Sequence, residues 1–331
     1  MHGASSEHAS KLVRDLRENI TGEVLSIENR KGFSERRNEI VLPKLFSSNI
    51  LRKFFQAVML PIYLTFLRTN HKTIFTFWTP NGGYHYLLFM FLKIIRYDII
   101  FTVISGYGKN YSCLRYCDSI VCQSNKMTKF IRSMFPNKKI FLIYPWTDLR
   151  LFNPGNKKNL MLVPSVPYKI ADFEERGIWQ LIKILKENKI KAKVIFRSKE
   201  SFDYFKGLKL ENVECIYKIL RDYELAEIMK DCKVIPLLYN KDAPDMPLSA
   251  IEGLSSGCAI VCTSDLGLSE IIEKEGAGII SDKKGFGSSI NKALKENFNS
   301  NARKAAEKYF KKENIKNYIR LIEGVNFINI K

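Results

Sequence analysis

The stretch MPLSAIEGLSSGCAIVCTSDLGLSEII, residues 246–272, decides the fold expected for this 331-residue chain. Its first part predicts a helix over residues 247–256, because apolar residues recur there at helical spacing, a proline stands in the first turn and Gly257 follows the end. The apolar run after it predicts a strand over residues 258–263, and a further helix is expected at residues 269–274. A helix, a strand and a helix in so short a span are typical of an α/β domain.

The start of the first of these helices offers a place for an anion. Leu248 and Ser249 follow Pro247, and their free backbone N–H groups, together with the helix dipole, favour negative charge there. Glu252 falls about 40° around the helix from Leu248, at the edge of the apolar arc. A half-buried carboxylate in that place can accept hydrogen bonds from a vicinal diol. Taken alone, a glutamate on an amphipathic helix is more often an ordinary surface residue.

The same alternation of short β-branched apolar runs and longer amphipathic runs continues along most of the chain. It occurs twice and is interrupted at residues 145–154, so two doubly wound, Rossmann-like domains are predicted, in agreement with the chain length. The expected strands are residues 23–27, 39–42, 73–78, 98–105, 119–123, 139–144, 160–166, 191–197, 213–217, 233–238, 258–263 and 278–280. The expected helices are residues 10–19, 49–68, 84–95, 126–134, 174–187, 201–207, 223–230, 247–256, 269–274, 288–296, 302–310 and 315–322.

The first predicted domain lacks an opening strand. A doubly wound domain normally begins with a buried strand that leads into a loop of small residues and then a helix. Only two residues precede the loop-like Gly3-Ala4-Ser5-Ser6 segment. We favour a true start upstream of this one over a domain built around a gap, and Gly3 and Ser5 are the candidate residues of a phosphate or acceptor loop.

The positive charge is concentrated in the first half. The chain has a net charge of +19, and residues 40–139 hold fourteen Lys or Arg residues against only Asp98 and Asp118, a net +12. A basic face of this size indicates a nucleic acid, an anionic lipid or an anionic small molecule as partner, unless it is simply a solvated surface. No nucleic acid is expected, because the interleaved aromatic residues and motifs of the known binding modules are absent.

The cysteines and the apolar runs bear on location. Seven cysteines without paired CxxC spacing or a completing histidine are expected to be reduced core thiols, which favours the cytoplasm. No signal peptide is recognised, and no run reaches the roughly 18 apolar residues that span a bilayer. The longest run, FFQAVMLPIYLTFL at residues 54–67, fits either a buried core helix or a segment lying in the headgroup layer of a membrane.

Several stretches resemble, in order and spacing, the group 1 (family 4-like) GT-B glycosyltransferases, and together they span most of the chain. IYPWTDLRLFNP at residues 143–154 is similar to the interdomain signature of that family. SIVCQSNKMTKFI at residues 119–131 resembles the strand and last helix of its acceptor domain, and ERGIWQLIKIL at residues 175–185 resembles the helix that opens its donor domain. Residues 246–272 are similar to the donor motif over their whole length.

The resemblance implies roles for particular residues. Glu252 would bind the ribose of a nucleotide, and the Leu248 and Ser249 amides would hold its diphosphate. Lys169 and Arg176 are the candidates for the two cations that stabilise the leaving nucleoside diphosphate, unless they are ordinary surface cations.

The remaining candidates stand where the chain departs from the family pattern. The first glutamate of the donor motif falls at Pro244, and only Asp245 could substitute for it. Arg197 replaces part of a glycine-rich turn and is either a phosphate-facing cation or a loop residue. Tyr217 and Lys218 lie where the base-binding loop of the family begins. The usual catalytic-region histidine is absent, with Ser105 and Gly106 in its place, and His85 is interpreted as a core residue.

The implied architecture is a GT-B fold whose two Rossmann-like domains face across a cleft. Residues 1–153 would bind the acceptor, residues 154–313 would bind a nucleotide diphosphate sugar, and residues 314–331 would form a helix returning to the first domain. The implied reaction is hexosyl transfer with retention. No metal and no cofactor are expected, because the chain contains no Asp-x-Asp motif.

The basic, apolar first half points to a lipid-linked or cell-surface glycan as acceptor, and to an anionic membrane surface as a further partner. The protein would then be cytoplasmic or bound peripherally to the cytosolic face. Two alternatives stay open: a degenerate GT-B protein that binds a nucleotide or an anionic polymer without transfer, and a nucleotide-sugar epimerase.

Overall fold

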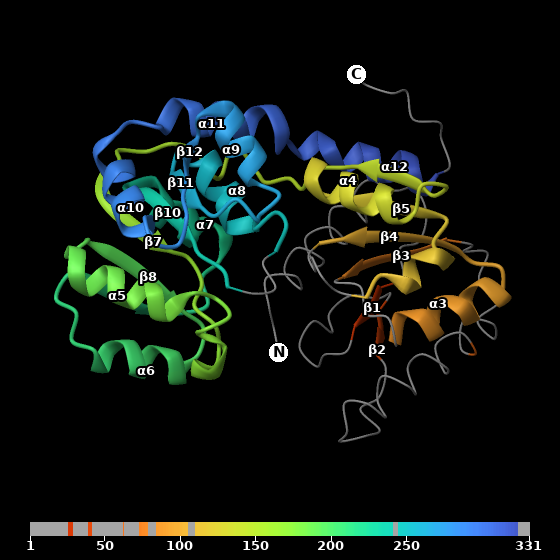
Figure 1. Cartoon of the computed structure of the whole chain (residues 1–331), viewed down its shortest axis with the longest axis horizontal. Coiled ribbons are helices and arrows are strands. Elements are labelled where there is room, and N and C mark those ends of the chain that lie inside the picture. Colours follow the sequence, from red (N-terminus) through yellow and green to blue (C-terminus); the bar gives the residue numbers. More distant parts are fainter. Residues whose placement is uncertain are drawn as a thin grey trace. The chain divides into compact units, whose positions relative to one another are not determined.

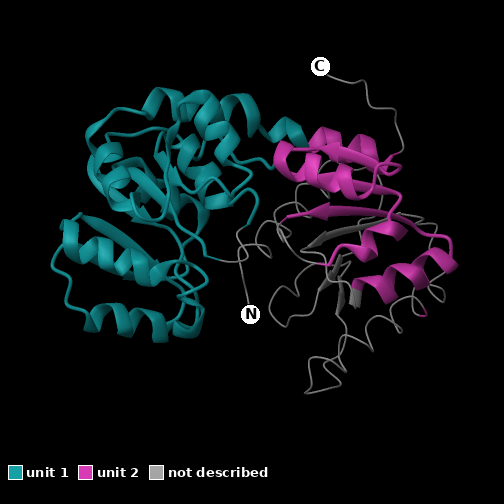
Figure 2. Cartoon of the chain, in the orientation of Figure 1, with its two compact units in different colours: residues 1–4, 144–314 teal, residues 5–143, 315–331 magenta. Residues whose placement is uncertain are grey.

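The chain forms two compact α/β units (Figure 2). Unit 1 is Tyr144–Asn314, and unit 2 comprises the described residues before Tyr144 together with those after Asn314. The computed structural model describes residues 26–28, 39–41, 62, 73–78, 84–104, 110–240 and 244–323.

Unit 1 is built on a six-stranded sheet in which all neighbouring strands are parallel (Figure 1). The strand order is β12-β11-β10-β7-β8-β9. The central strands are almost wholly buried, as expected for a parallel sheet covered by helices on both faces. The strands are β7 (Lys158–Val163), β8 (Ala192–Phe196), β9 (Val213–Tyr217), β10 (Cys232–Leu237), β11 (Ala259–Cys262) and β12 (Gly278–Ile280).

Alternate residues of these strands point into two separate cores. Ile235 and Ile260 belong to one core, whereas Val234 and Val261 belong to the other. The first core is closed by α7 (Asp222–Asp231), α8 (Leu248–Ser255), α9 (Ser269–Glu275) and α11 (Asn299–Tyr309). The second is closed by α5 (Ile178–Asn188), α6 (Lys199–Gly207) and α10 (Phe286–Lys295). Unit 1 is therefore doubly wound, as predicted.

Unit 2 has a parallel four-stranded sheet of order β3-β4-β5-β6, and β1 (Ser26–Glu28) and β2 (Glu39–Val41) form a separate parallel pair. The core of this unit gathers side chains such as Phe89, Phe101 and Leu114. The other elements are β3 (Thr73–Trp78), α3 (Tyr84–Ile94), β4 (Asp98–Val103), the 3-10 helix η1 (Ser112–Tyr116), β5 (Ser119–Cys122), α4 (Asn125–Met134), β6 (Lys139–Leu142) and α12 (Ile315–Ile322).

Two expectations can be compared with single residues of unit 2. His85 is buried, and its ring lies 5.6 Å from that of Phe89 and 5.7 Å from that of Phe101, so it is a core residue as interpreted. The helix α12 buries Ile315 and Tyr318 and belongs to this unit.

Most helix starts in unit 1 differ from the prediction by one to four residues, and two of these differences bear on the candidate site. The helix expected from residue 174 begins at Ile178, because residues 173–177 form turns and Gly177, the N-cap, adopts a left-handed conformation with φ +62°. Pro247 precedes α8 as its N-cap instead of lying in its first turn.

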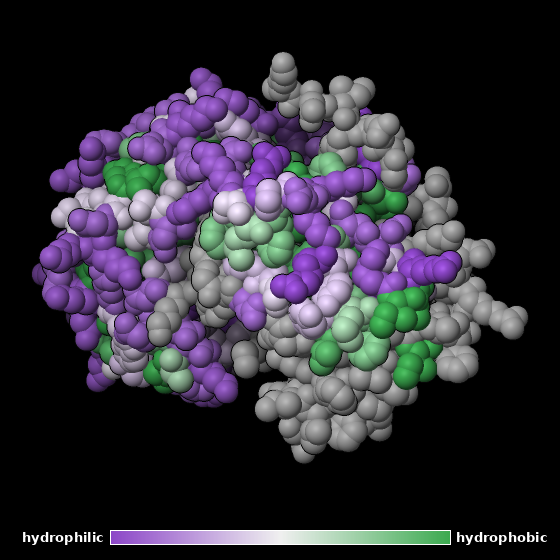
Figure 3. All heavy atoms as spheres, turned by 45° about the vertical axis from the view of Figure 1, so that its right-hand side comes forward, coloured by the Kyte–Doolittle hydropathy of each residue, from purple (hydrophilic) through white to green (hydrophobic). Residues whose placement is uncertain are grey.

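Several predictions lie outside the described residues. These are Gly3, Ser5, the helix expected at residues 10–19, almost all of the helix expected at residues 49–68 and the Ser105-Gly106 segment. Within the described residues, none of the helices is long and apolar enough to cross a membrane. In the view of Figure 3, hydrophilic residues cover most of the described surface, and hydrophobic residues form small groups between them.

Candidate functional site

The topology of unit 1 picks out one edge of its sheet. After β7 the chain adds β8 and β9 on one side, and it then returns to add β10, β11 and β12 on the other. The strand order therefore reverses between β7 and β10. In open α/β sheets, ligands bind at the carboxyl ends of the strands at such a reversal. The candidate site is thus framed by the connection after β7 and the connection after β10.

The connection after β7 carries both candidate cations. Lys169 is exposed and precedes the 3-10 helix η2 (Ile170–Asp172). Arg176 is partly buried and stands just before Gly177. A Cβ atom on Gly177 would lie 2.6 Å from the Leu238 carbonyl oxygen, at the end of β10. The absence of a side chain at Gly177 thus lets the connection after β7 approach the end of β10.

Direct contacts join the two connections. The Arg176 guanidinium lies over the Tyr239 ring, 5.3 Å from its centroid. Burial raises the pKa of Tyr239, and the nearby Arg176 charge opposes that rise. The Asn240 backbone N–H donates to the Glu175 carbonyl at 2.9 Å, and the Asn240 side chain donates to the Glu174 carbonyl at 2.6 Å. Arg176 is consequently held at the strand-order reversal.

The start of α8 presents backbone donors to the same edge. The first intrahelical bonds of α8 are donated by Ala250 and Ile251, both to the Pro247 carbonyl, so the Leu248 and Ser249 amides precede the hydrogen-bonded part of the helix. Pro247 supplies no side-chain cap. This arrangement can accept an anion through two N–H groups and the helix dipole.

The residues before and within α8 are firmly packed. Asp245 has no exposed surface, and its backbone carbonyl accepts a hydrogen bond of 3.2 Å from Leu268 in the connection after β11. Glu252 is only 8% exposed, so its carboxylate is more buried than the helical period alone predicted. Glu252 already has an interaction within the protein, but its two carboxylate oxygens can accept several hydrogen bonds, so the hydroxyl pair of a polyol could bind there as well.

Arg197 lies next to the connection after β7, whereas Tyr217 ends the edge strand β9 and Lys218 follows it. Ser198, directly after Arg197, donates a hydrogen bond of 2.5 Å to the Tyr168 carbonyl. The Tyr217 ring stacks on Phe202 at 5.3 Å, and Lys218 forms an ion pair with Glu224 of α7. The strand order therefore places Arg197 nearer the β7–β10 reversal than Tyr217 and Lys218, and the Lys218 charge is already paired.

Sequence reasoning missed Tyr239 and Asn240. Both follow a predicted strand, and that position was the available signal for a site residue. Asn240 also accepts a hydrogen bond of 2.6 Å from Lys283, in the connection after β12. It thus links three connections at one edge of the sheet.

No metal-binding cluster of His, Cys, Asp or Glu occurs in the part of the chain that the structure describes. The seven cysteines are free thiols, six of them buried and Cys215 partly exposed. Burial raises the pKa of Cys262, in β11, to about 12, which keeps that thiol protonated.

No family model and no curated protein matches the chain, but solved structures share its fold. Sucrose-phosphate synthase from Thermosynechococcus elongatus is similar over 97% of this chain and 94% of its own, with a TM-score of 0.75 and 14% identity. WaaG, a glycosyltransferase involved in lipopolysaccharide biosynthesis, is similar over 98% of this chain and 97% of its own, with a TM-score of 0.70 and 12% identity. HepE from Anabaena, in complex with UDP, is similar over 81% of this chain and 82% of its own, with a TM-score of 0.62 and 14% identity. The chain therefore has the two-domain GT-B fold, as predicted.

Proposed function

We propose that this protein transfers a hexosyl unit from a nucleotide diphosphate sugar to a lipid-linked or cell-surface glycan, with retention of configuration and without a metal. The observation that supports this proposal is the strand-order reversal between β7 and β10: Arg176 lies in the connection after β7, and the two amides at the start of α8 and the buried Glu252 follow β10. Proteins of the same fold support it, since HepE is in complex with UDP and WaaG is a glycosyltransferase.

Each of these groups has a task in such a transfer. Bond breaking leaves negative charge on the nucleoside diphosphate, and donors already aimed at that charge lower the barrier. The Leu248 and Ser249 amides and the Arg176 guanidinium would stabilise the leaving diphosphate, with Lys169 as a second, more mobile cation. Glu252 would accept hydrogen bonds from the ribose hydroxyls. Protein cations and helix amides would thus take the part that a divalent metal plays in metal-dependent transferases.

The donor half of the proposal is tested by the release of UDP or GDP from a panel of nucleotide sugars. Glu252→Ala should lower kcat/KM about 10- to 100-fold, since a hydrogen bond to a charged group is worth about 1.5–3 kcal/mol. Glu252→Gln keeps the shape of the side chain but loses its charge, so its kcat/KM should lie between that of the unchanged chain and that of Glu252→Ala. Glu273→Ala, an exposed glutamate of α9, is the matched control.

The proposed site would be contradicted if Glu252→Ala transferred or hydrolysed the nucleotide sugar with the same kcat/KM as the unchanged chain. Because Glu252 is buried, circular dichroism and thermal unfolding of each variant are needed to separate lost binding from lost folding. A thermal-shift screen against UDP, GDP and ADP sugars would identify the base.

The acceptor half of the proposal rests on the basic and apolar character of residues 40–139. Such a surface would bind peripherally to an anionic membrane, where a lipid-linked acceptor is found. In liposome flotation, the protein should float with anionic vesicles and remain behind with neutral ones, and added salt should release it. Equal recovery with both vesicle types would contradict this part of the proposal.

A second candidate function is nucleotide binding without transfer. It is favoured by Pro244 in the place of the first motif glutamate and by the neighbouring Asp245, whose side chain has no exposed surface with which to reach a sugar. Under this function no nucleotide sugar would be turned over, yet UDP or GDP would raise the unfolding temperature, and Glu252→Ala would abolish that rise.

A further inference from the structure

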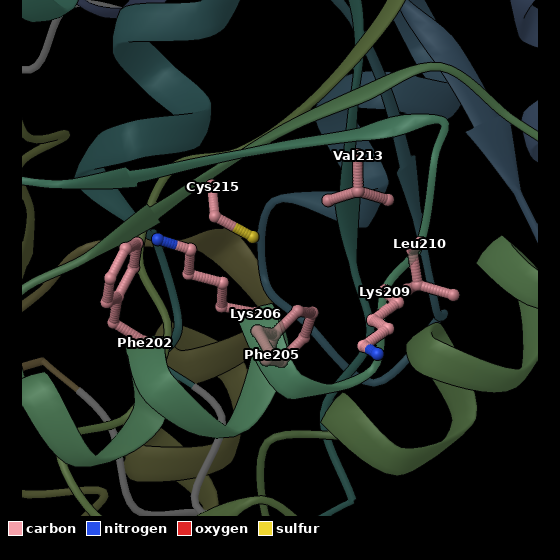
Figure 4. Close-up of a pocket in the computed structure, with 7 residues that line it drawn as sticks. All are labelled: Phe202, Phe205, Lys206, Lys209, Leu210, Val213 and Cys215. Carbon is pink, nitrogen blue, oxygen red and sulfur yellow. The ribbon is translucent and has the colours of Figure 1, made fainter.

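A groove of about 270 Å³ lies between α6 and the edge strand β9, away from the candidate site (Figure 4). It borders the C-terminal half of α6, the connection to β9 and the first half of β9, whereas the candidate site residues follow the carboxyl ends of the strands. Val213 and Cys215 project from β9 toward the side chains of α6. Phe205 and Leu210 complete an apolar wall.

The charge of this groove is positive. Lys206 and Lys209 line it, and no acidic residue does. Neither lysine forms an ion pair with any residue that the structure describes, and Lys206 instead lies 5.6 Å from the centroid of the Phe202 ring. Nearby lysines behave differently, since Lys199 and Lys193 are each paired with a carboxylate. The groove thus keeps two uncompensated cations beside an apolar wall.

The backbone at Lys209 is left-handed, with φ +49°. Arg96 and Lys189, which also follow helices, have positive φ as well, so this conformation belongs to the helix end, and glycine would adopt it without strain. The Lys209 side chain lines the groove.

We propose that this groove binds a small free anion with an apolar body, of the alkyl carboxylate class. The volume corresponds to about nine water molecules at roughly 30 Å³ each, which suits a molecule of about ten non-hydrogen atoms. The alkyl chain lies against the partly exposed Phe202, Leu210 and Val213, where its burial is favourable. The carboxylate pairs with the Lys206 ammonium, beside Phe202 and Cys215, while the Lys209 ammonium lies at the other end of the groove and adds positive charge at longer range (Figure 4). This site is independent of the proposed transfer reaction.

Cys215 provides a direct reporter of occupancy. It lines the groove, and it is partly exposed while the other six cysteines of the chain are buried. Neutral iodoacetamide should therefore alkylate Cys215 first in the native protein, and a Cys215→Ser variant should lose that reaction. Burial raises the pKa of the Cys215 thiol and the Lys206 charge lowers it, so each variant is compared with and without anion at one fixed pH.

The experiment measures the alkylation rate of Cys215 by mass spectrometry in the full chain, with octanoate as the probe and below its micelle concentration. Protection should saturate, and the rate should fall roughly tenfold when octanoate stands at about ten times its dissociation constant. Lys206→Gln and Lys209→Gly should each raise the half-protection concentration about two- to fivefold. Lys209→Gly suits the left-handed backbone, so it removes the charge without strain.

Lys304→Gln, an exposed lysine of α11, is the control and should leave protection unchanged. Equal protection by octanol or octylammonium would overturn the proposal, because the groove would then recognise only an apolar chain. It would also be overturned if octanoate gave no protection, if anionic vesicles protected Cys215 while octanoate did not, or if alkylation slowed with protein concentration, as a second copy covering the groove requires.

Discussion

Arg176 has a guanidinium that is already held in place in the protein without a ligand. Its contact with the face of the Tyr239 ring removes part of the side-chain freedom that a free surface arginine would lose on binding. Lys169 is exposed and keeps that freedom. The two cations of the proposed site therefore differ in the conformational entropy that their side chains lose when the diphosphate binds.

This difference predicts unequal effects of mutation. Arg176→Gln should lower kcat for nucleotide release about 10²- to 10³-fold, as the loss of a positioned electrostatic donor does. Lys169→Gln should cost about tenfold or less, since an exposed charge is screened by solvent. Steady-state kinetics with one donor sugar would measure both. An equal or reversed order would show that preorganisation by Tyr239 does not matter.

Among the elements, α5 shows how one glycine positions a connection. The helix starts only after Gly177, whose left-handed conformation turns the chain and brings Arg176 next to the end of β10. A side chain there would meet both a strained φ and the Leu238 carbonyl.

Gly177→Ala should therefore destabilise unit 1. The left-handed conformation costs alanine about 1–2 kcal/mol. The added Cβ atom would also clash with the Leu238 carbonyl, and the shift of the connection after β7 that removes this clash would destabilise the unit further. Urea unfolding would measure the loss, and the KM for donor should rise with it. Gly207→Ala is the matched control: it ends α6, meets no atom within 4 Å, and should be neutral or slightly stabilising. Similar stability of the two variants would contradict the argument.

At the scale of the whole molecule, ion pairs between elements make unit 1 sensitive to acid. Hydrogen bonds from Lys308 and Tyr309 lower the pKa of Glu275, which ties α9 to α11. A hydrogen bond from Lys158 likewise lowers the pKa of Asp231. A carboxyl whose folded pKa lies below its unfolded value stabilises the fold at neutral pH and loses that contribution as pH falls through the folded pKa.

The urea midpoint of unit 1 should consequently fall as pH drops through and below the ordinary carboxyl range. Glu275→Gln should lower the midpoint at neutral pH and make it less dependent on pH. Glu211 is exposed and forms no ion pair with any described residue, so Glu211→Gln should change neither the urea midpoint at neutral pH nor its dependence on pH. A Glu275→Gln profile parallel to that of the unchanged chain would show that this link contributes nothing.

Much of this fold was predictable because its signals are local. The strands at residues 73–78, 213–217 and 278–280 and the helix at residues 315–322 have the bounds predicted for them, since apolar runs and helical periods are written in consecutive residues. The start of α5 was predicted four residues early, because residues 174–177 have helix-forming character and only the observed φ of Gly177 shows the turn.

The candidate site divides in the same way. By itself, the sequence determined the alternation of elements, the two doubly wound domains and the helix that follows Pro247, because these depend on neighbours along the chain, whereas the GT-B architecture was predicted from the family resemblance. Tertiary structure alone decided that Arg176 rests on Tyr239, that Asn240 joins three connections and that Lys218 is engaged by Glu224. Those contacts depend on which strands become neighbours in the sheet, and strand order is set by long-range packing that no local period of the sequence encodes.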